Sequence, residues 1–461
     1  MNTLIASESV SLSARSLAAV WHPCTQMHLA QDQPPLAIAK GQGAWLYGED
    51  GKAYFDAISS WWVNLLGHAH KGIAEGITRQ LALLPHVMLA GCTHEPAVVL
   101  AERLAARTHG HLGHAFYGSD GASAVEVALK MSFHYWRNLG QGQKRRFICL
   151  AGSYHGETLG ALGVTDVAIF RSTYSDLIQQ AIVIPSPACA DLRHQDAHLQ
   201  TALNQLERVL QKQATEVSAL ILEPLVQAAG GMNMYPPAYL SRARQLCTQY
   251  GVHLIADEIA VGCGRTGRFF AWEHSLLEDA QACDWPDFIT LSKGVTGGTL
   301  PLSVVLCQHA VYRAFLSEDI ARGFLHSHSY TGNPLACAAA IATLDALEGG
   351  VLETLPEQEQ HLSVAMQGLR EDARIENYRQ IGCIAACDLK QEYASATFSA
   401  QMHLAGRAHG LLIRPIGRSI YVMPPFVLNA QLATDLQVAL VRALDQALHA
   451  PVQLVAKTVA I

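Results

Sequence analysis

Four side chains that could do chemistry come directly after predicted β-strands: Asp257, Lys293, Tyr154 and Glu223. In open α/β sheets, ligands bind beyond the carboxyl ends of the strands. Each residue has an ordinary interpretation: Asp257 with Glu258 could only cap a helix, and Lys293 could mark where a buried strand reaches the surface. An amine, two carboxylates and an aromatic ring at one edge of a sheet together indicate a cofactor site.

These residue types suit pyridoxal phosphate. This cofactor needs a lysine that holds it covalently and a carboxylate beside its pyridine nitrogen, so that the ring stays protonated and accepts electrons. Lys293 and Asp257 supply these groups, and the glycines after Lys293 would let the backbone pass close to the cofactor. Dinucleotide-binding and P-loop glycine patterns, and a G-x-S-x-G nucleophile elbow, do not occur.

The phosphate of such a cofactor needs a cradle, and the segment 117–131 offers one. A glycine-containing turn opens a predicted helix, so the backbone N–H groups of Gly121, Ala122 and Ser123 would point at the phosphate, aided by the helix dipole. The Ser123 hydroxyl could add a further bond. Taken alone, the same segment equally describes an ordinary capped helix.

The elements that must position these residues alternate along the middle of the chain. Short apolar runs alternate with helical patterns such as 196–213 and 237–251, which favours α/β layering around a mostly parallel sheet. The runs are apolar at nearly every position, as expected for strands covered on both faces. The predicted strands are 145–152, 217–224, 251–258, 287–293 and 302–308.

The two ends of the chain differ from the middle. Residues 335–370 are mainly helical, and 381–389 and 419–426 supply strands of a smaller α+β unit. The segment 43–59 has the pattern of a hairpin with Glu49-Asp50-Gly51 as its turn. We therefore predict a large domain over 65–335 and a small domain that combines the N-terminal segment 1–64 with 336–461.

Composition limits the class of protein. The chain has 461 residues, of which 50% are apolar and 15% charged, and its net charge is −7. This predicts a globular protein that binds no nucleic acid, since long basic runs are missing. No apolar run reaches the roughly 18 residues of a membrane span, and residues 1–20 lack a secretory pattern.

Cysteine and histidine usage points to a cytoplasmic protein without a metal site. The 11 cysteines are scattered and form no C-x-x-C pair, which is typical of reduced thiols in the cytoplasm. Among the 22 histidines, the pairs His68 with His70 and His326 with His328 could each face one way on a strand. No acidic or cysteine partner stands at ligand spacing, so no metal is expected.

With these motifs in place, the sequence resembles the class III (ω-type) aminotransferases of fold type I. The run LIADEIAVGCGRTGRFFAWE (254–273), with Lys293 36 residues after Asp257, carries the resemblance, which extends from Trp21 to about Pro425. Within the family, five motifs resemble the branch that serves biotin biosynthesis. They are WHPCTQM (21–27), SSWWVNLLGH (59–68), EPLVQAAGGMNMY (223–235), TGNPLACAAA (331–340) and IRPIGRSIYVMPP (413–425).

The resemblance implies roles at the cofactor. Lys293 would bind it covalently, Asp257 would pair with its ring nitrogen, and Tyr154 and Ile259 would pack on its two faces. Gly121 and Ala122 would bind its phosphate. Ser329, next to His328 in the segment 326–333, stands where the family usually has a threonine that reaches the phosphate of the neighbouring subunit. The resemblance therefore implies a homodimer with shared active sites.

The resemblance also implies a substrate pocket. Arg414 would clamp a substrate carboxylate in a bidentate geometry that lysine cannot reproduce, and Tyr421, Trp61 and Trp62 would line the pocket. Cys24 stands where close relatives carry tyrosine, which puts the pocket shape in doubt. Two other departures, Glu157 for aspartate and Ser329 for threonine, conserve the chemistry. Glu223 and Arg265 match family active-site positions without an assignable role.

The resemblance implies transfer of an amino group from S-adenosylmethionine to 8-amino-7-oxononanoate, which yields 7,8-diaminononanoate. Two alternatives stay open from the sequence. One is a class III ω-aminotransferase that uses lysine or another amine as donor. The other is a catalytically silent relative, which would be expected to lose Lys293 or Asp257, and both are present.

Overall fold

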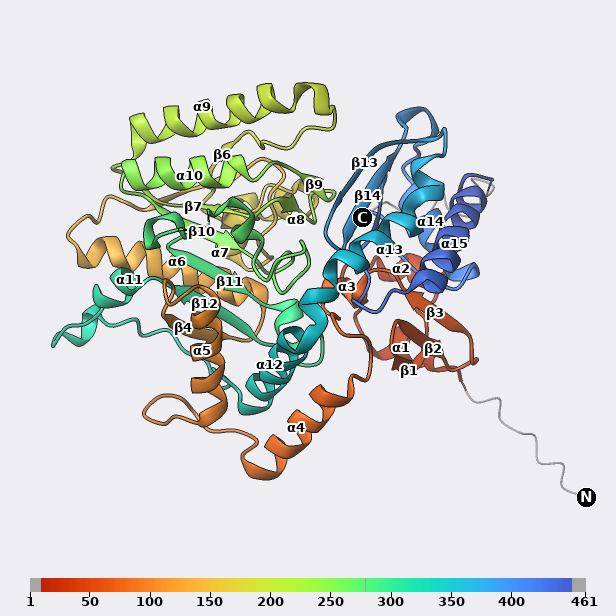
Figure 1. Cartoon of the computed structure of the whole chain (residues 1–461), viewed down its shortest axis with the longest axis horizontal. Coiled ribbons are helices and arrows are strands. Elements are labelled where there is room, and N and C mark those ends of the chain that lie inside the picture. The colour runs from red at the N-terminus through yellow and green to blue at the C-terminus, as the bar shows by residue number, and fades with distance from the viewer. Residues whose placement is uncertain (1–9, 278, 450–461) are drawn as a thin grey trace, which may run out of the picture.

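The computed structural model describes residues 10–277 and 279–449, and a large mixed sheet forms its centre (Figure 1). Neighbouring strands from β11 to β6 are parallel, while β12 runs antiparallel to both β11 and β4. In spatial order the strands are β4 (His114–Gly118), β12 (Ser303–Cys307), β11 (Phe288–Leu291), β10 (His253–Asp257), β7 (Val217–Leu222), β5 (Arg146–Leu150) and β6 (Ile182–Ile184). The predicted mostly parallel α/β sheet is confirmed; β4 and β6 were not predicted.

Helices cover both faces of this sheet, which explains why its central strands are apolar at nearly every position. α6 (Gly121–Asn138) packs on one face, against side chains such as Ile255 and Phe288. The alternate strand residues, such as Leu254 and Ile289, face the other layer. That layer contains α5 (Glu95–Arg107), α9 (Gln195–Gln213), α10 (Ala238–Gln249) and α12 (Pro334–Ala346).

A second core joins the two ends of the chain (Figure 1). Its antiparallel sheet has β13 (Ile375–Ile381), β14 (Ile384–Leu389) and β16 (Ser419–Val422), and its helices are α13 (Leu352–Arg370), α14 (Phe398–Ala408) and α15 (Ala430–His449). The N-terminal β1 (Ile38–Gln42), β2 (Trp45–Gly48) and β3 (Ala53–Asp56) form a sheet with β15 (Leu411–Leu412). The hairpin predicted over 43–59 is present as β2 and β3. The predicted domain boundaries at 64 and 335 stay predictions.

Shorter elements complete the described chain. They are α1 (Leu12–Ala19), α2 (Met27–Ala30), α3 (Ser59–Trp62), α4 (Lys71–Leu83), α7 (Leu159–Gly163), α8 (Ala168–Arg171), α11 (His309–Arg313), β8 (Val226–Gln227) and β9 (Asn233–Met234).

One helix is longer and more apolar than the sequence patterns indicated. By length and composition alone, the helix Pro334–Arg370 could cross a membrane. A π-helical turn at Leu347–Val351, in which Gly350 has a φ of 129°, separates α12 from α13. α12 buries Cys337, Ala339 and Leu344 in the large core and packs against α4 and α5. This burial explains its apolar composition, because a core helix passes the same test.

Candidate active site

Two adjoining cavities lie beyond the carboxyl ends of the parallel strands. The inner one has a volume of about 280 Å³ and the outer one about 410 Å³. Trp62, Tyr154, Glu157 and Lys293 line both. The strand ends that the sequence singled out therefore meet around one composite site.

Lys293 stands at the boundary between the two cavities. The chain turns sharply after β11, and Lys293 has a left-handed φ of 43°, a conformation that costs a non-glycine residue about 1–2 kcal/mol. Burial lowers the pKa of its amine, while the nearby Asp257 and Glu223 oppose this shift. The amine thus lies in a buried setting that shifts it toward its neutral form, with two carboxylates close enough to oppose that shift.

The glycines after Lys293 serve packing instead of approach to a cofactor. A Cβ at Gly294 would lie 3.0 Å from the Leu65 side chain, and one at Gly297 would lie 2.4 Å from that of Ile73. Neither glycine lines the inner cavity. We expected these glycines to let the backbone approach the cofactor. In the structure, Gly294 and Gly297 instead allow the turn after Lys293 to pack closely against Leu65 and Ile73.

Asp257 ends β10 and is held by three donors. Its Oδ1 accepts hydrogen bonds from the Ile259 N–H (3.1 Å) and the Thr290 hydroxyl (3.2 Å). Its Oδ2 lies 2.7 Å from Nδ1 of the buried His155, which faces it as a donor. Sequence reasoning missed His155, although its place beside Tyr154 after β5 was a usable signal. The carboxylate is fixed at the wall of the inner cavity.

The N-terminus of α6 forms another wall of this cavity. Gly121 and Ala122 line it, as predicted for phosphate ligands, but Ser123 does not. The Ser123 N–H and hydroxyl both donate to the carboxylate of Asp120, at 2.9 and 2.7 Å. Asp120 is the N-cap of α6, so the cap takes the donors that the sequence had assigned to a phosphate.

The segment after β5 brings an aromatic ring to the site. The Tyr154 N–H donates to Glu223 (3.0 Å), and the Tyr154 hydroxyl donates to Glu157 (2.8 Å). Glu223 also accepts from the Ala228 N–H (2.9 Å), and burial raises the pKa of its carboxyl to about 7. The position of Glu223 thus suggests a role: it anchors the backbone that presents Tyr154.

The outer cavity combines a guanidinium with aromatic walls. The Arg414 guanidinium carbon lies 5.1 Å from the centre of the Trp61 ring, and Arg414 donates to the Cys24 carbonyl (3.1 Å). Trp62 Nε1 donates to the Tyr421 hydroxyl (3.2 Å), and the Lys293 amine lies 5.2 Å from the centre of the Trp62 ring. Like Lys293, the five other predicted substrate residues line this cavity: Cys24, Trp61, Trp62, Arg414 and Tyr421.

Arg265, His328 and Ser329, which the sequence matched to family site positions, lie away from both cavities, as does Glu258 beside Asp257. Arg265 is buried and donates to the backbone carbonyls of Trp62, Asn64 and Pro424. Glu258 accepts from two backbone N–H groups of the 3₁₀ turn Ala271–Ser275. The His328 ring contacts the Ser119 hydroxyl (3.2 Å), and Ser329 is exposed.

Comparisons with known proteins agree with this geometry. The family model described as aminotransferase class-III matches residues 27–444. The adenosylmethionine-8-amino-7-oxononanoate aminotransferase of Helicobacter pylori is 40% identical over 95% of this chain and 98% of its own. This chain belongs to the class III aminotransferases.

Solved structures extend the comparison to the fold. The crystal structure of adenosylmethionine-8-amino-7-oxononanoate aminotransferase from Methanocaldococcus jannaschii matches with a TM-score of 0.88 and 32% identity, over 94% of this chain and 98% of that one. An ω-transaminase of Pseudomonas jessenii, solved in complex with PMP, matches with a TM-score of 0.86 and 24% identity. The match covers 97% of this chain and 100% of that one. The second likeness concerns the fold alone.

Class III aminotransferases use pyridoxal 5′-phosphate, and the inner cavity of this aminotransferase fits that group. A helix N-terminus with free N–H groups stands at Gly121 and Ala122, where anions bind well. Asp257 supplies a carboxylate for a ring nitrogen, and Lys293 supplies the amine. A Cβ at Gly156 would lie 2.7 Å from that of Ala122, so glycine here lets the Tyr154 segment close over the cradle.

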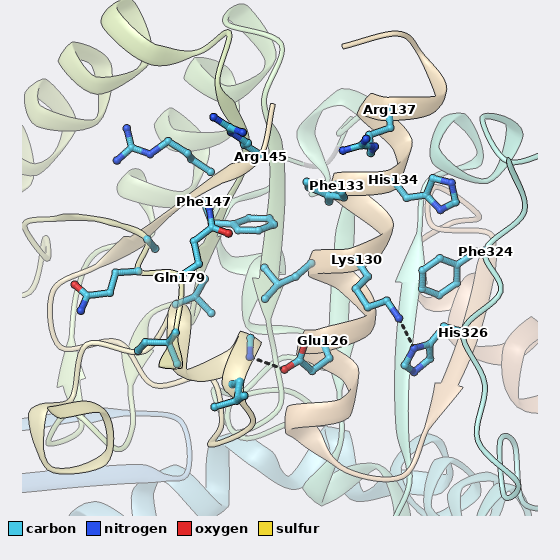
Figure 2. Close-up of a pocket in the computed structure, with 18 of the residues that line it drawn as sticks. Glu126, Lys130, Phe133, His134, Arg137, Arg145, Phe147, Gln179, Phe324 and His326 are labelled. Atoms are coloured by element: carbon cyan, nitrogen blue, oxygen red, sulfur yellow. Dashed lines mark hydrogen bonds between the residues drawn. The ribbon is translucent and has the colours of Figure 1, made fainter. Parts of the chain in front are cut away.

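A separate cavity of about 720 Å³ lies on the outer side of α6 (Figure 2). Lys130, His134 and Arg137 face it from α6, but none of the predicted site residues lines it. On its floor, Glu126 accepts from the Gly160 N–H (2.8 Å) and ties α7 to α6. Within residues 10–277 and 279–449, no group of three or more His, Cys, Asp or Glu side chains could hold a metal ion.

Proposed function

We propose that this aminotransferase transfers an amino group from S-adenosylmethionine to 8-amino-7-oxononanoate in biotin biosynthesis. One observation carries the proposal: the Arg414 guanidinium and aromatic rings line a cavity that also contains the Lys293 side chain in its wall. Relatives that bear the corresponding name are 33–40% identical to this chain over 82–95% of its length.

The outer cavity suits both substrates in turn. Each carries a carboxylate, which the planar guanidinium of Arg414 can bind through two parallel hydrogen bonds. A sulfonium is favoured over an indole face by about 0.5–2 kcal/mol, and Trp61 offers such a face, with 39% of its surface exposed. Glu157, also on this wall, supplies a negative charge for the cationic groups of either substrate.

The chain's own residues then move one proton. Pyridoxal phosphate supplies an electron sink when bound. The Lys293 amine would take a proton from the substrate carbon, hold it as the ammonium and return it later in the transfer, and its lowered pKa favours the free base that this step needs. Asp257, held by His155, Ile259 and Thr290, would supply a negative charge to the ring nitrogen of the cofactor.

The donor is the first property to test. We expect S-adenosylmethionine alone to convert the bound cofactor in a single turnover, seen as loss of its visible absorption, and then to support formation of 7,8-diaminononanoate, measured by mass spectrometry. Lysine at the same concentration should give at least about 10-fold lower turnover, because lysine lacks the sulfonium that Trp61 would contact. A difference of about 10-fold corresponds to about 1.4 kcal/mol. Turnover with lysine but not with S-adenosylmethionine would make the alternative donor class correct.

We also propose a homodimer in which Ser329 serves the partner's phosphate site. Ser329 is exposed and lies outside the cavity of its own chain. Two segments carry exposed apolar side chains: its own segment has Leu316, Ile320, Leu325 and Tyr330, and the segment 81–88 has Leu81, Leu83 and Met88. The two segments that carry them meet, because the His86 and Tyr330 rings are 4.8 Å apart. An exposed apolar area of this kind marks an interaction surface.

Subunit complementation tests this arrangement. Lys293→Ala and Ser329→Asp should each be inactive, the second because a carboxylate would repel the phosphate. Since a two-fold dimer repeats each contact, randomly mixed chains should recover about a quarter of wild-type activity, from the one intact site of each heterodimer. Ser327→Asp, an exposed change in the same loop, should stay active. Full activity of Ser329→Asp, or no recovery on mixing, would contradict the shared site.

The cellular setting remains a proposal. The 11 cysteines are free thiols, in keeping with the cytoplasmic location predicted from their pattern. The net charge of −7 still argues against a nucleic-acid partner. The proposed partners are therefore the two small-molecule substrates and a second copy of the chain.

A further inference from the structure

The segment that carries both tryptophans has an unusual backbone. Four consecutive residues have left-handed φ values: Ser59 (51°), Ser60 (48°), Trp61 (72°) and Trp62 (74°). Such a conformation is unfavourable for a residue with a Cβ, because the Cβ comes too close to the following carbonyl oxygen. None of the four is a glycine, so this turn, residues 59–62, needs compensation from the structure around it.

Asp56 supplies the most concentrated compensation. Its fully buried carboxylate accepts from the Ser60 N–H (2.8 Å) through Oδ1 and from the Ser60 hydroxyl (2.7 Å) through Oδ2. Oδ2 also lies 2.8 Å from Nε2 of His68. Hydrogen bonds to a charged group are stronger than those between neutral groups, and two of them hold Ser60 in its strained conformation. Because Asp56 ends β3, the carboxylate itself stands on a rigid element.

The turn determines where the two rings lie. Trp61 points outward beside Arg414, with 39% of its surface exposed, whereas Trp62 is 4% exposed and lies against Lys293 and Tyr421. If the turn were right-handed, the Trp61 and Trp62 side chains would leave the backbone in directions other than the observed ones. The left-handed turn is thus what places both indoles in the wall of the outer cavity and Trp62 also in the wall of the inner one.

We propose that Asp56 is a positioning residue for substrate binding, which acts through the left-handed turn 59–62 and the two indoles that it presents. Asp56 lines neither cavity, so it has no direct contact with a ligand there. This inference rests on the proposed substrate role of Trp61 and Trp62. It adds a determinant of substrate affinity that lies outside the pocket.

The test separates substrate binding from folding. In Asp56→Ala, we expect the KM for the amino donor to rise about 10-fold or more, because misplacement of a binding group by about 1 Å can cost up to about 100-fold. The kcat per bound cofactor and the cofactor content should stay within about threefold of wild type, since Lys293 and Asp257 are untouched. Asp56→Asn keeps one acceptor for the Ser60 N–H, so its KM for the amino donor should rise less. This variant replaces Asp56→Ala in the test if the alanine variant does not fold.

Two further variants sharpen the result. Asp56→Ala combined with Ser60→Gly should recover part of the lost affinity, because glycine adopts the left-handed backbone without the Cβ penalty. Asp50→Ala removes an exposed carboxylate from the neighbouring β2–β3 turn and should leave the KM unchanged.

An unchanged KM in both Asp56 variants, or a loss confined to cofactor content, would overturn the inference. The assay uses whichever amino donor wild type accepts, so a different donor would refute the proposed function without affecting this result.

Discussion

Lys293→Ala should lower transamination by roughly 10³-fold or more, an increase in activation free energy of about 4 kcal/mol or more. Among the residues that the structure describes, Lys293 is the one lysine on the walls of the two adjoining cavities, and proton transfer by a positioned group contributes about 10²–10⁴-fold. Loss of covalent attachment adds to this effect. The measurement is the single-turnover rate with donor, at saturating cofactor.

The fate of the cofactor distinguishes loss of chemistry from loss of binding. Lys293→Ala should still bind pyridoxal phosphate, because Gly121, Ala122 and Asp257 remain in place. A small primary amine added to the buffer should restore part of the rate by carrying the proton. Rates that stay near wild type in this variant would exclude Lys293 as the proton carrier.

Lys144 offers a matched control, since it is also a buried lysine whose pKa burial lowers, here to about 8. Its amine donates to the carbonyls of Ala214, Val217 and Gly251 and lies 4.5 Å from the centre of the Trp136 ring. Lys144→Ala should therefore lower the free energy of unfolding by about 1–3 kcal/mol, because buried carbonyls lose their donor. Turnover per folded molecule should stay at the wild-type value.

Asp257→Asn should lower kcat by about 10²–10³-fold with a small change in thermal stability. The amide can keep the bonds from Ile259 and Thr290, so the fold is preserved. It removes the negative charge beside the ring nitrogen, and electrostatic stabilisation of this kind is worth about 3–4 kcal/mol at an active site. The check is kcat against melting temperature, measured on the same preparation loaded with cofactor.

Glu258→Gln is the control for this change, because the two carboxylates are adjacent in sequence and both are buried. Glu258 holds the N–H groups of Ala271 and Trp272 at 2.8 and 2.7 Å. Its substitution should cost about 1–3 kcal/mol of stability and leave kcat nearly unchanged. The reverse pattern, a catalytic loss in Glu258→Gln and none in Asp257→Asn, would show that the wrong carboxylate has been assigned.

Apolar periodicity alone could not choose between the adjacent carboxylates Asp257 and Glu258, and the family resemblance assigned the role to Asp257. Successive side chains of a strand point to opposite faces, so only one of two neighbouring carboxylates can face the cavity. The sequence placed both at the correct strand end. Which one turns toward Lys293 depended on the packing of β10 between β7 and β11.

Ser123 illustrates a competition that local patterns do not resolve. Its position in the first turn of α6 was correctly predicted, and a free N–H there would suit an anion. The carboxylate of Asp120 takes both donors instead, as N-cap side chains commonly do. The cradle is therefore smaller than the motif indicated and consists of Gly121 and Ala122.

By itself, the sequence determined the mostly parallel sheet, the strand ends that carry Asp257, Tyr154 and Lys293, and the joining of the two chain ends. Apolar periodicity and short-range turn chemistry encode these features, so they can be read from neighbours in the chain.

Only the tertiary structure decided the role of His155, the place of Arg265 behind Trp62, and the left-handed turn at residues 59–62. The intrinsic preferences of serine and tryptophan oppose that turn. It exists because Asp56, His68 and the carbonyl of Met423 gather around it from segments up to 364 residues away, and such contacts outweigh local preference only once the chain has folded.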